Sequence, residues 1–215
     1  ATVYYDGLSR PIQNVSKETS EISPNTWADM TGFTEYDAAG RNPKSYLNYP
    51  STSTIGKFKT NAKIEQASFI QNTYAQPVSA PTYSLTTFEN SPLSRVLNVK
   101  EPGDGYGGNP SYVGNSFQYE LNSASEHIKM WKIGFLESDI PILYGEYTDG
   151  KLYKSIVIDE KSKRTYEYKD FSGNVILKKV QLDNNALDNT HDGWLCTYYV
   201  YDDLGQLRST ITPKA

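Results

Sequence analysis

A short pattern recurs five times in this chain: an aspartate, followed three residues later by glycine or serine, and then by a basic or polar residue. The five copies are Asp6–Arg10, Asp37–Arg41, Asp159–Lys163, Asp170–Asn174 and Asp202–Gln206. Tyr5, Tyr36 and Tyr201 directly precede the aspartate in three of them. A turn sequence that is repeated between strand-like segments predicts a modular surface built by strand pairing.

The chemistry of these segments explains why they should be turns. An aspartate side chain can accept hydrogen bonds from backbone N–H groups two or three residues later. Glycine three residues after the aspartate, as in Gly40, Gly173 and Gly205, adopts a positive φ at low steric cost. Serine stands there at Ser9 and Ser162, so we expect less favourable turns in those two copies. The alternative interpretation is that such turns are simply common in β-rich proteins.

The spacing of the turns predicts the fold class. The interval from Asp159 to Asp170 equals one strand plus one tight turn, so we expect a mainly β chain of antiparallel hairpins that form a meander. Asp149-Gly150 predicts a further short hairpin. Two polar runs, residues 17–26 and 181–192, are predicted as loops, the second bulging from the meander.

One segment, near residues 61–75, is expected to be an α-helix. Pro77 ends it, and Thr60 or Asn61 can cap its start. The residues that recur at helical spacing are Ile64, Ala67, Ile70 and Tyr74.

A Gly- and Pro-rich run at 101–110 predicts a long loop that divides the chain. We expect residues 1–110 to form an N-terminal β-rich cap region that contains the helix. Residues 111–215 should form the antiparallel meander of repeats, and the two parts can pack as one unit.

Composition excludes two classes of partner. The 215 residues carry a net charge of −4, so the chain lacks the basic character of a nucleic-acid-binding domain. No stretch approaches the roughly 20 apolar residues of a membrane span. Cys196 is the single cysteine, which forbids an intramolecular disulfide and leaves the compartment undecided.

Four of the five arginines follow closely after a repeated turn. They are Arg10, Arg41, Arg164 and Arg208. This placement indicates a structural role, in which the guanidinium pairs with the aspartate of a neighbouring repeat or stacks on its tyrosine. Solvated surface charge is the alternative.

Enzyme chemistry is not indicated. Cys196 could pair with His127 or His191, but no local motif supports a catalytic cysteine, and Cys196 lies in an apolar, strand-like run. The two histidines lack the spacing of a zinc site. We therefore expect no catalytic residue, metal or cofactor.

Aromatic residues near the C-terminus allow a binding site. Trp194, Tyr198 and Tyr199 could form a platform on which a sugar ring or a peptide stacks. The alternative is that alternate members of this stripe pack between sheet layers.

The chain also resembles a known family along nearly its whole length, from Val3 to Ala215. The segments YYDGLSRPIQNV, EYDAAGRNPKSYLNYP, FENSPLSRVLNVKEPG, LYKSIVIDE, EYKDFSGNVILKKVQ and YYVYDDLGQLRSTITPKA are similar to the N-terminal region of bacterial RHS/YD-repeat proteins, of the large secreted type common in Bacteroidetes. The chain departs from the usual pattern at Ser9, where glycine is expected, and at Thr212, where proline often precedes Pro213.

This resemblance implies that the hairpins belong to the spiral sheet of a hollow RHS shell, which encloses a variable C-terminal toxin. The expected function is a non-enzymatic structural module that encapsulates or displays a toxin or effector, in a bacterial protein that is secreted or at the cell surface. The implied partners are the remainder of its own shell or a companion chain, joined through sheet edges, and a toxin cargo.

Two alternatives remain at this point. The chain could be a cell-surface carbohydrate- or protein-binding β module that uses exposed tyrosine and tryptophan. It could also be a secreted hydrolase with an unfamiliar motif.

Overall fold

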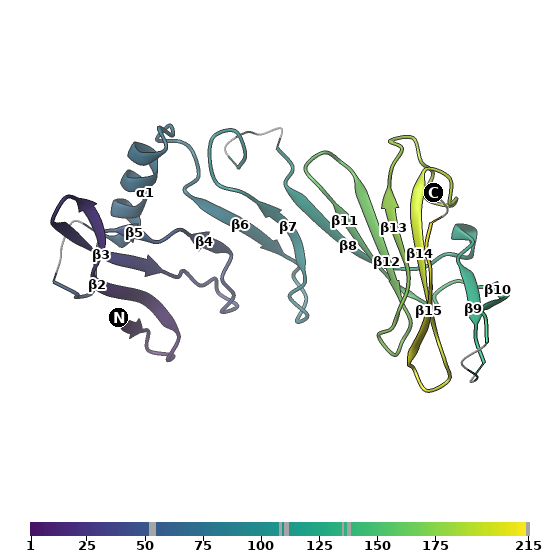
Figure 1. Ribbon diagram of the computed structural model, residues 1–215. Coiled ribbons are helices and arrows are strands. Elements are labelled where there is room, and N and C mark those ends of the chain that lie inside the picture. Colours follow the sequence, from purple (N-terminus) through teal and green to yellow (C-terminus); the bar gives the residue numbers. More distant parts are fainter. Residues whose placement is uncertain (52–54, 108, 110–111, 135, 137–138, 214–215) are drawn as a thin grey trace. The chain divides into compact units, whose positions relative to one another are not determined.

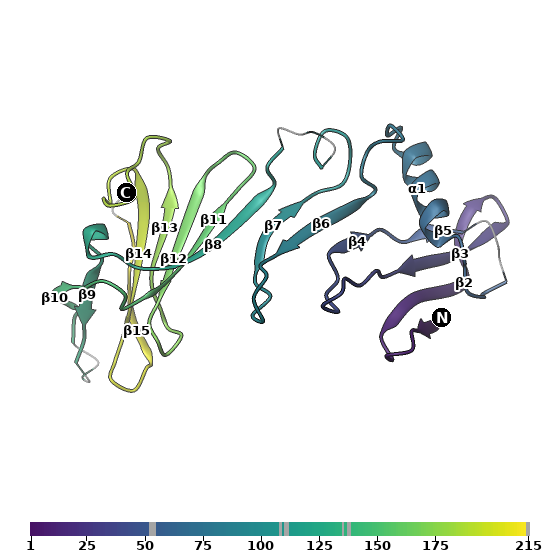
Figure 2. The same ribbon diagram turned by 180° about the vertical axis from the view of Figure 1, so that it is seen from behind.

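The computed structural model describes residues 1–51, 55–107, 109, 112–134, 136 and 139–213. The chain forms two compact units, Ala1–Gly114 and Asn115–Ala215 (Figures 1 and 2). The Gly- and Pro-rich run predicts a division of the chain near residue 110. The prediction of a mainly β chain built from antiparallel strands is confirmed. None of the described helices has the length and apolarity that crossing a membrane requires.

The N-terminal unit holds two groups of antiparallel strands. The first is a sheet in the order β1-β2-β3-β5, made of β1 (Thr2–Tyr5), β2 (Pro11–Ser23), β3 (Thr26–Phe33) and β5 (Tyr49–Pro50). In the second group β6 (Tyr83–Phe88) pairs with β4 (Lys44–Tyr46) and with β7 (Val96–Lys100).

The predicted helix is present as α1 (Ala62–Thr73), but its buried face differs from the expected one. The buried residues are Ala62, Gln66 and Ile70, whereas Ile64 is 69% exposed. Gln66 is tolerated on this face because its Nε2 donates a hydrogen bond to the carbonyl of Thr82 at 3.0 Å. Asn61 occupies the N-cap position without a side-chain capping bond.

The loop predicted for residues 17–26 is wrong, because β2 continues to Ser23 and pairs with β3 on both sides of an irregularity. Asp29 on β3 holds this irregularity in place. Its Oδ1 accepts the N–H of Glu18, which has a φ of 49°, at 3.0 Å, and its Oδ2 accepts the N–H of Gly56 at 2.6 Å.

Asp29 also forms a buried ion pair. Its Oδ2 lies 2.8 Å from Nζ of Lys59, and the side chains are 0% and 5% exposed. Burial opposes the ionisation of Asp29, but the hydrogen bonds from Lys59 and from two backbone N–H groups outweigh it. They hold the pKa of Asp29 below its ordinary value of 3.8.

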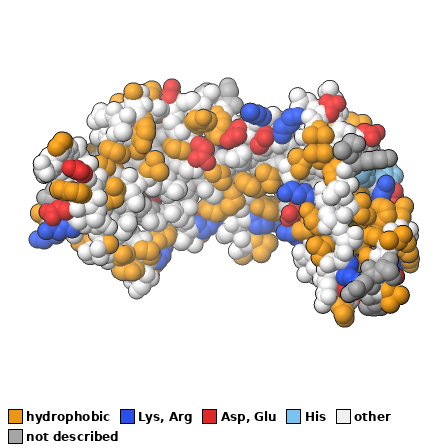
Figure 3. Space-filling model, viewed as in Figure 1, with side chains coloured by type: hydrophobic (Ala, Val, Ile, Leu, Met, Phe, Trp, Pro, Cys, Tyr) orange, Lys and Arg blue, Asp and Glu red, His pale blue; other side chains and the backbone are white. Residues whose placement is uncertain are grey.

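The C-terminal unit is a meander with a separate hairpin beside it. Its sheet has the order β8-β11-β12-β13-β14-β15, made of β8 (Asn115–Leu121), β11 (Tyr153–Ile158), β12 (Arg164–Lys169), β13 (Val175–Gln181), β14 (Trp194–Tyr201) and β15 (Leu207–Ile211). The separate hairpin pairs β9 (Lys129–Lys132) with β10 (Ile142–Glu146). In Figure 3 hydrophobic side chains gather over this hairpin, and Tyr144 on β10 is 64% exposed.

The hairpin predicted at Asp149-Gly150 is wrong. Strand β10 pairs with β9, and β11 pairs with β8 and β12, so the two strands that flank Asp149 are not partners. The Oδ1 of Asp149 instead accepts the N–H of Ala124, in the short 3₁₀ helix η1 (Ala124–Glu126), at 2.6 Å. Gly150 donates its N–H to the carbonyl of Asn122 at 2.9 Å.

The core of the C-terminal unit lies on one face of its sheet. Ile156, Tyr166, Tyr168, Leu177 and Tyr198 come from four adjacent strands and share this face. The residues that cover them from outside the sheet include Ile128, before β9, and Ala186, in the run after β13.

The polar run 181–192 lies against the core face of the meander, whereas the sequence predicted that it bulges away. Lys179 is 1% exposed, and its Nζ donates to the carbonyls of Asp188 at 2.9 Å and Thr190 at 2.7 Å. Nε1 of Trp194 donates to the carbonyl of Leu187 at 3.0 Å. These bonds hold the polar run against the core face, because each satisfies a buried donor.

We expect the Asp29→Asn substitution to lower the free energy of unfolding by about 3 kcal/mol, because it leaves the Lys59 ammonium buried without its counter-charge. Urea denaturation at pH 7 measures this loss. The pKa of Asp29 is depressed in the folded state, so its contribution is present above pH 3.8 and disappears as the pH falls through the lower folded value. Acidification below pH 3.8 should therefore cost the variant less stability than it costs the wild type.

The Asp29→Asn/Lys59→Met double variant is the control, because it removes both charges and should recover part of the loss. A loss of less than about 1 kcal/mol in the single variant, as at an exposed ion pair, would contradict this account.

Candidate functional site: the repeated turns and the pocket between two of them

All five repeated segments form the same turn. In each, the N–H of the aspartate donates to the carbonyl four residues later at 2.9–3.0 Å, and the N–H three residues later donates back to the aspartate carbonyl at 2.9–3.1 Å. The aspartate Oδ1 accepts the N–H groups two and four residues later, at 2.8–3.0 Å. One carboxylate oxygen therefore satisfies two backbone donors in every turn.

The third residue after the aspartate is left-handed in every copy. The glycines Gly40, Gly173 and Gly205 have φ values of 77°, 90° and 74°. Ser9 and Ser162 adopt the same conformation, with φ values of 60° and 62°. Their turns have the same hydrogen bonds as the glycine turns, so serine accepts the steric cost without a change of geometry.

A sixth turn of this kind joins β6 to β7, and the sequence pattern missed it because serine replaces the aspartate. Ser91 Oγ accepts the N–H of Leu93 at 3.2 Å, and its carbonyl accepts the N–H of Ser94, whose φ is 49°. The signal that could have revealed it is the triplet Leu-Ser-Arg, which ends this turn at Arg95 as it ends the first turn at Arg10.

Glu89 supplies the missing carboxylate in this sixth turn. Its Oε2 lies 2.9 Å from the guanidinium of Arg95, and its Oε1 accepts the hydroxyl of Ser91 at 2.5 Å. Hydrogen bonds from Arg95 and Ser91 lower the pKa of Glu89 to about 2.

In the N-terminal unit, arginine links each turn to the next. Arg10 contacts the carboxylate of its own turn, with NH2 2.7 Å from Oδ2 of Asp6, and its guanidinium lies 4.4 Å from the ring centroid of Tyr36. Tyr36 is the residue that precedes the next turn. The contact to the ring is one of the two predicted roles, but the carboxylate belongs to the same turn and not to a neighbour, which corrects that prediction.

Arg41 repeats this arrangement one turn further on. Its Nε lies 2.8 Å from Oδ2 of Asp37, and its guanidinium lies 4.9 Å from the ring centroid of Phe88, which precedes the sixth turn. NH1 of Arg41 also donates to the carbonyl of Glu89 at 3.0 Å. We refer to the contacts of Arg10 with Tyr36 and of Arg41 with Phe88 as the arginine clasps.

Hydrogen bonds within the turns lower the pKa values of three of the turn aspartates. The hydrogen bond from the backbone N–H of Arg10, followed by the bond from its guanidinium, holds the pKa of Asp6 below its ordinary value. The pKa of Asp37 is lowered in the same way by Arg41, and that of Asp202 by the backbone N–H of Gln206. These carboxylates are therefore ionised at neutral pH.

In the C-terminal unit, the basic residues that end or follow the turns have other partners. Lys163 follows the Asp159 turn, and its Nζ donates to the carbonyl of Leu182 at 2.8 Å. Arg164 contacts Asp188 at 2.6 Å, and Arg208 contacts Asp202 at 3.4 Å.

After the Asp170 turn, the position that Arg10 and Arg41 occupy belongs to Asn174. Its Nδ2 donates to Oδ2 of Asp170, within its own turn, at 3.0 Å.

The structure contradicts the aromatic platform. Trp194 and Tyr198 are 6% and 5% exposed and pack in the core, while the neighbouring Tyr199 lies on the opposite face of β14. The hydroxyl of Tyr198 accepts the N–H of Lys129 at 3.1 Å. The alternative interpretation, in which alternate members of the stripe pack between layers, describes this arrangement.

The possible Cys/His pair is partly brought together. Cys196 and His191 line one pocket of about 470 Å³, whereas His127 contacts Glu146 at 3.0 Å. Burial raises the pKa of the Cys196 thiol, which disfavours the thiolate that a nucleophilic cysteine needs. His191 has a pKa lowered by burial, and its Nε2 lies 2.6 Å from the hydroxyl of Tyr198. Within the described ranges, no group of three or more His, Cys, Asp or Glu side chains could hold a metal ion.

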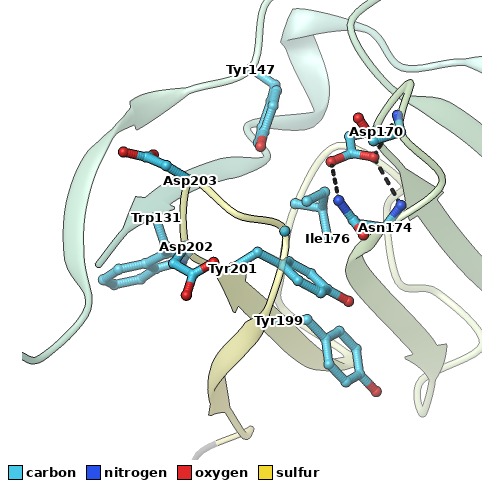
Figure 4. Close-up of a pocket in the computed structure, with 11 residues that line it drawn as sticks. Trp131, Tyr147, Asp170, Asn174, Ile176, Tyr199, Tyr201, Asp202 and Asp203 are labelled. Carbon is cyan, nitrogen blue, oxygen red and sulfur yellow. Dashed lines mark hydrogen bonds between the residues drawn. The ribbon is translucent and has the colours of Figure 1, made fainter. Parts of the chain in front are cut away.

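A pocket of about 280 Å³ lies between two of the repeated turns (Figure 4). The Asp170 turn forms one side, and the Asp202 turn with Tyr201 forms another. The side chains that Figure 4 labels in its lining are Trp131, Tyr147, Asp170, Asn174, Ile176, Tyr199, Tyr201, Asp202 and Asp203. We call this the turn pocket. The predicted turn residues Asp170, Tyr201, Asp202 and Gly205 thus meet at one site together with Tyr199.

Comparison with known proteins gives a family for the N-terminal part. The family model DUF6443, described as a domain of unknown function, matches residues 1–120, which is more than half of the chain. No curated protein and no solved structure is significantly similar. The matched residues include both arginine clasps, and the turn pocket lies beyond them.

We expect the Gly173→Ala substitution to destabilise the protein by about 1–2 kcal/mol. A Cβ at Gly173 would meet no atom within 4 Å, so the cost comes from the backbone φ of 90° alone. Ser162→Gly removes the same kind of strain, offset by about 0.5–1 kcal/mol of chain entropy, and should stabilise slightly or have no effect. Urea denaturation of the full chain measures both.

Gly7→Ala is the matched control. Gly7 also lies in a turn with open space around it, but it has no positive φ, so the substitution should change stability by less than about 0.5 kcal/mol. Equal losses at Gly7 and Gly173 would refute the conformational explanation.

A double-mutant cycle tests the second arginine clasp. We expect Arg41→Gln and Phe88→Leu to show a coupling of about 0.5–1 kcal/mol, since each removes one partner of the same cation–π contact. In the control cycle, Arg10→Gln and Phe88→Leu should add to within about 0.5 kcal/mol, because these residues belong to different clasps. Additivity in both cycles would show that the guanidinium does not interact with the ring.

Proposed function

The chain belongs to the DUF6443 family, and we propose that it is a non-enzymatic structural module of an RHS/YD-repeat shell that encapsulates or displays a C-terminal toxin or effector. The observation that supports this most is the pair of arginine clasps, in which Arg10 lies on Tyr36 and Arg41 lies on Phe88. Each clasp joins a turn to the one that follows it.

The clasps favour a wall of consecutive hairpins for a geometric reason. A hairpin by itself is only marginally stable, so a continuous sheet of hairpins gains stability from contacts between neighbours. A side chain that holds its own turn closed and also contacts the next turn fixes the spacing between consecutive hairpins. Such contacts suit a repeated wall whose function is mechanical.

The sheet edges provide the expected points of attachment. Strand β1 is an edge of the four-stranded sheet, and β15 is an edge of the meander. An edge strand presents backbone N–H and C=O groups that can pair with another strand. In the proposal these edges join the remainder of the shell or a companion chain, in a bacterial protein that is secreted or at the cell surface.

The test uses the full-length product of the gene that encodes this chain. Electron microscopy should show a hollow particle, and limited proteolysis should leave the C-terminal segment intact while the particle is closed. The same C-terminal segment expressed alone is the control and should be digested rapidly. An extended particle, or equal digestion rates for the two forms, would disprove encapsulation.

A cell-surface binding module is the competing function, and the half-buried Tyr199 that lines the turn pocket is the observation that favours it. A glycan array with the wild type and Tyr199→Ala separates the two, because a shell wall should bind no glycan specifically. Trp194 and Tyr198 are unsuitable for this comparison, since substitution would disrupt the core in which they are buried.

A further inference from the structure

The turn pocket occupies the place between two consecutive turns that an arginine side chain fills between the equivalent turns of the N-terminal unit. In that unit the Asp6 turn ends with Arg10, whose guanidinium lies on Tyr36, the residue before the Asp37 turn. In the meander the Asp170 turn joins β12 to β13, and the next turn at the same end of the sheet is the Asp202 turn, which joins β14 to β15. Tyr201 precedes that turn as Tyr36 precedes its own.

Asn174 holds the place of the arginine and is too short to make the same contact. Its amide is used within its own turn, where Nδ2 donates to Oδ2 of Asp170. Tyr201 therefore faces the turn pocket, and no lysine or arginine is among the described residues that line this pocket. In Figure 4 Asp170 and Asn174 lie on one side of Tyr201, and Asp203 lies on the other.

The chemistry of the pocket suits a planar cation. Asp170, Asp202 and Asp203 line it, together with the rings of Tyr147 and Tyr201. Asp202 is already paired with Arg208, and Asp170 is bonded within its turn, so Asp203 is the carboxylate most open to a new partner.

The negative charge of Asp170 acts on both tyrosine rings of the pocket. Burial raises the pKa of Tyr147 and of Tyr201, and the negative charge of Asp170 raises both further. A cation placed between these groups would gain attraction from the carboxylates and from the ring faces at once.

We propose that the turn pocket binds the guanidinium of an arginine side chain from a polypeptide, seated over Tyr201 among the carboxylates that line the pocket, as Arg10 is seated over Tyr36. Guanidinium is favoured over ammonium because a planar group can stack on the ring while its edge donates to carboxylates. The inference does not depend on the shell proposal, since a surface-binding module could use the same pocket.

The probe for this site is N-acetyl-L-arginine methylamide, titrated into the ¹⁵N-labelled protein and followed by NMR. We expect saturable shifts at the amides of the turn pocket, such as Ser172 and Gly205. The matching lysine derivative should bind more weakly, and the neutral citrulline derivative should not bind. Equal binding of citrulline would overturn the proposal, and so would equal binding of lysine.

Three variants locate the site. Tyr201→Leu should weaken binding about two- to fivefold, the effect of removing an exposed cation–π contact. Asn174→Arg supplies the arginine within the chain, so it should abolish binding of the probe and raise the melting temperature. Lys163→Arg is the control at the equivalent position of the Asp159 turn and should leave binding unchanged.

The Asn174→Arg variant keeps the proposal testable if Tyr201→Leu fails to fold. Wild-type affinity in Asn174→Arg would overturn the assignment. Titration of the full-length gene product identifies the source of the arginine. If the protein's own chain fills the pocket, the probe should not bind, and if a separate partner fills it, the probe should bind as it does to residues 1–215.

Discussion

The structure depends on one interaction, the acceptance of two backbone N–H groups by a single aspartate oxygen. In each repeated turn this bond closes a loop of fixed length, and loop length determines the register of the strands that leave it. The register then decides which side chains reach the core. In the meander the Asp170 turn aligns Tyr168 on β12 with Leu177 on β13, so large residues from adjacent strands share one buried face.

The second oxygen of the same carboxylate connects the turn to its surroundings. In Asp6 and Asp37 it holds an arginine, which is thereby directed onto the aromatic ring before the next turn. The aspartate thus contributes to local closure and, through the arginine, to contact between hairpins. Where asparagine replaces arginine after Asp170, the local closure remains and the contact is replaced by a pocket.

The two cores contain charges that the turns alone do not explain. Asp29 and Lys59 are buried together in the N-terminal unit, and Lys179 is buried in the meander, where two carbonyls of the polar run bind its ammonium. Burial lowers the pKa of Lys179, as expected for an ammonium group removed from water. In both units a buried charge holds an irregular segment against regular strands.

The sequence by itself determined the fold class, the positions of the five aspartate turns and the presence of the helix, because each follows from interactions between residues close along the chain. Only the tertiary structure decided which face of the helix is buried, since Gln66 finds its partner at Thr82. It alone determined that β10 pairs with β9 and that Lys179 binds the polar run 181–192. It also determined that Tyr198 is buried in the core while Tyr199 lies on the opposite face of β14. These outcomes depend on partners far apart in the sequence, which local patterns do not contain.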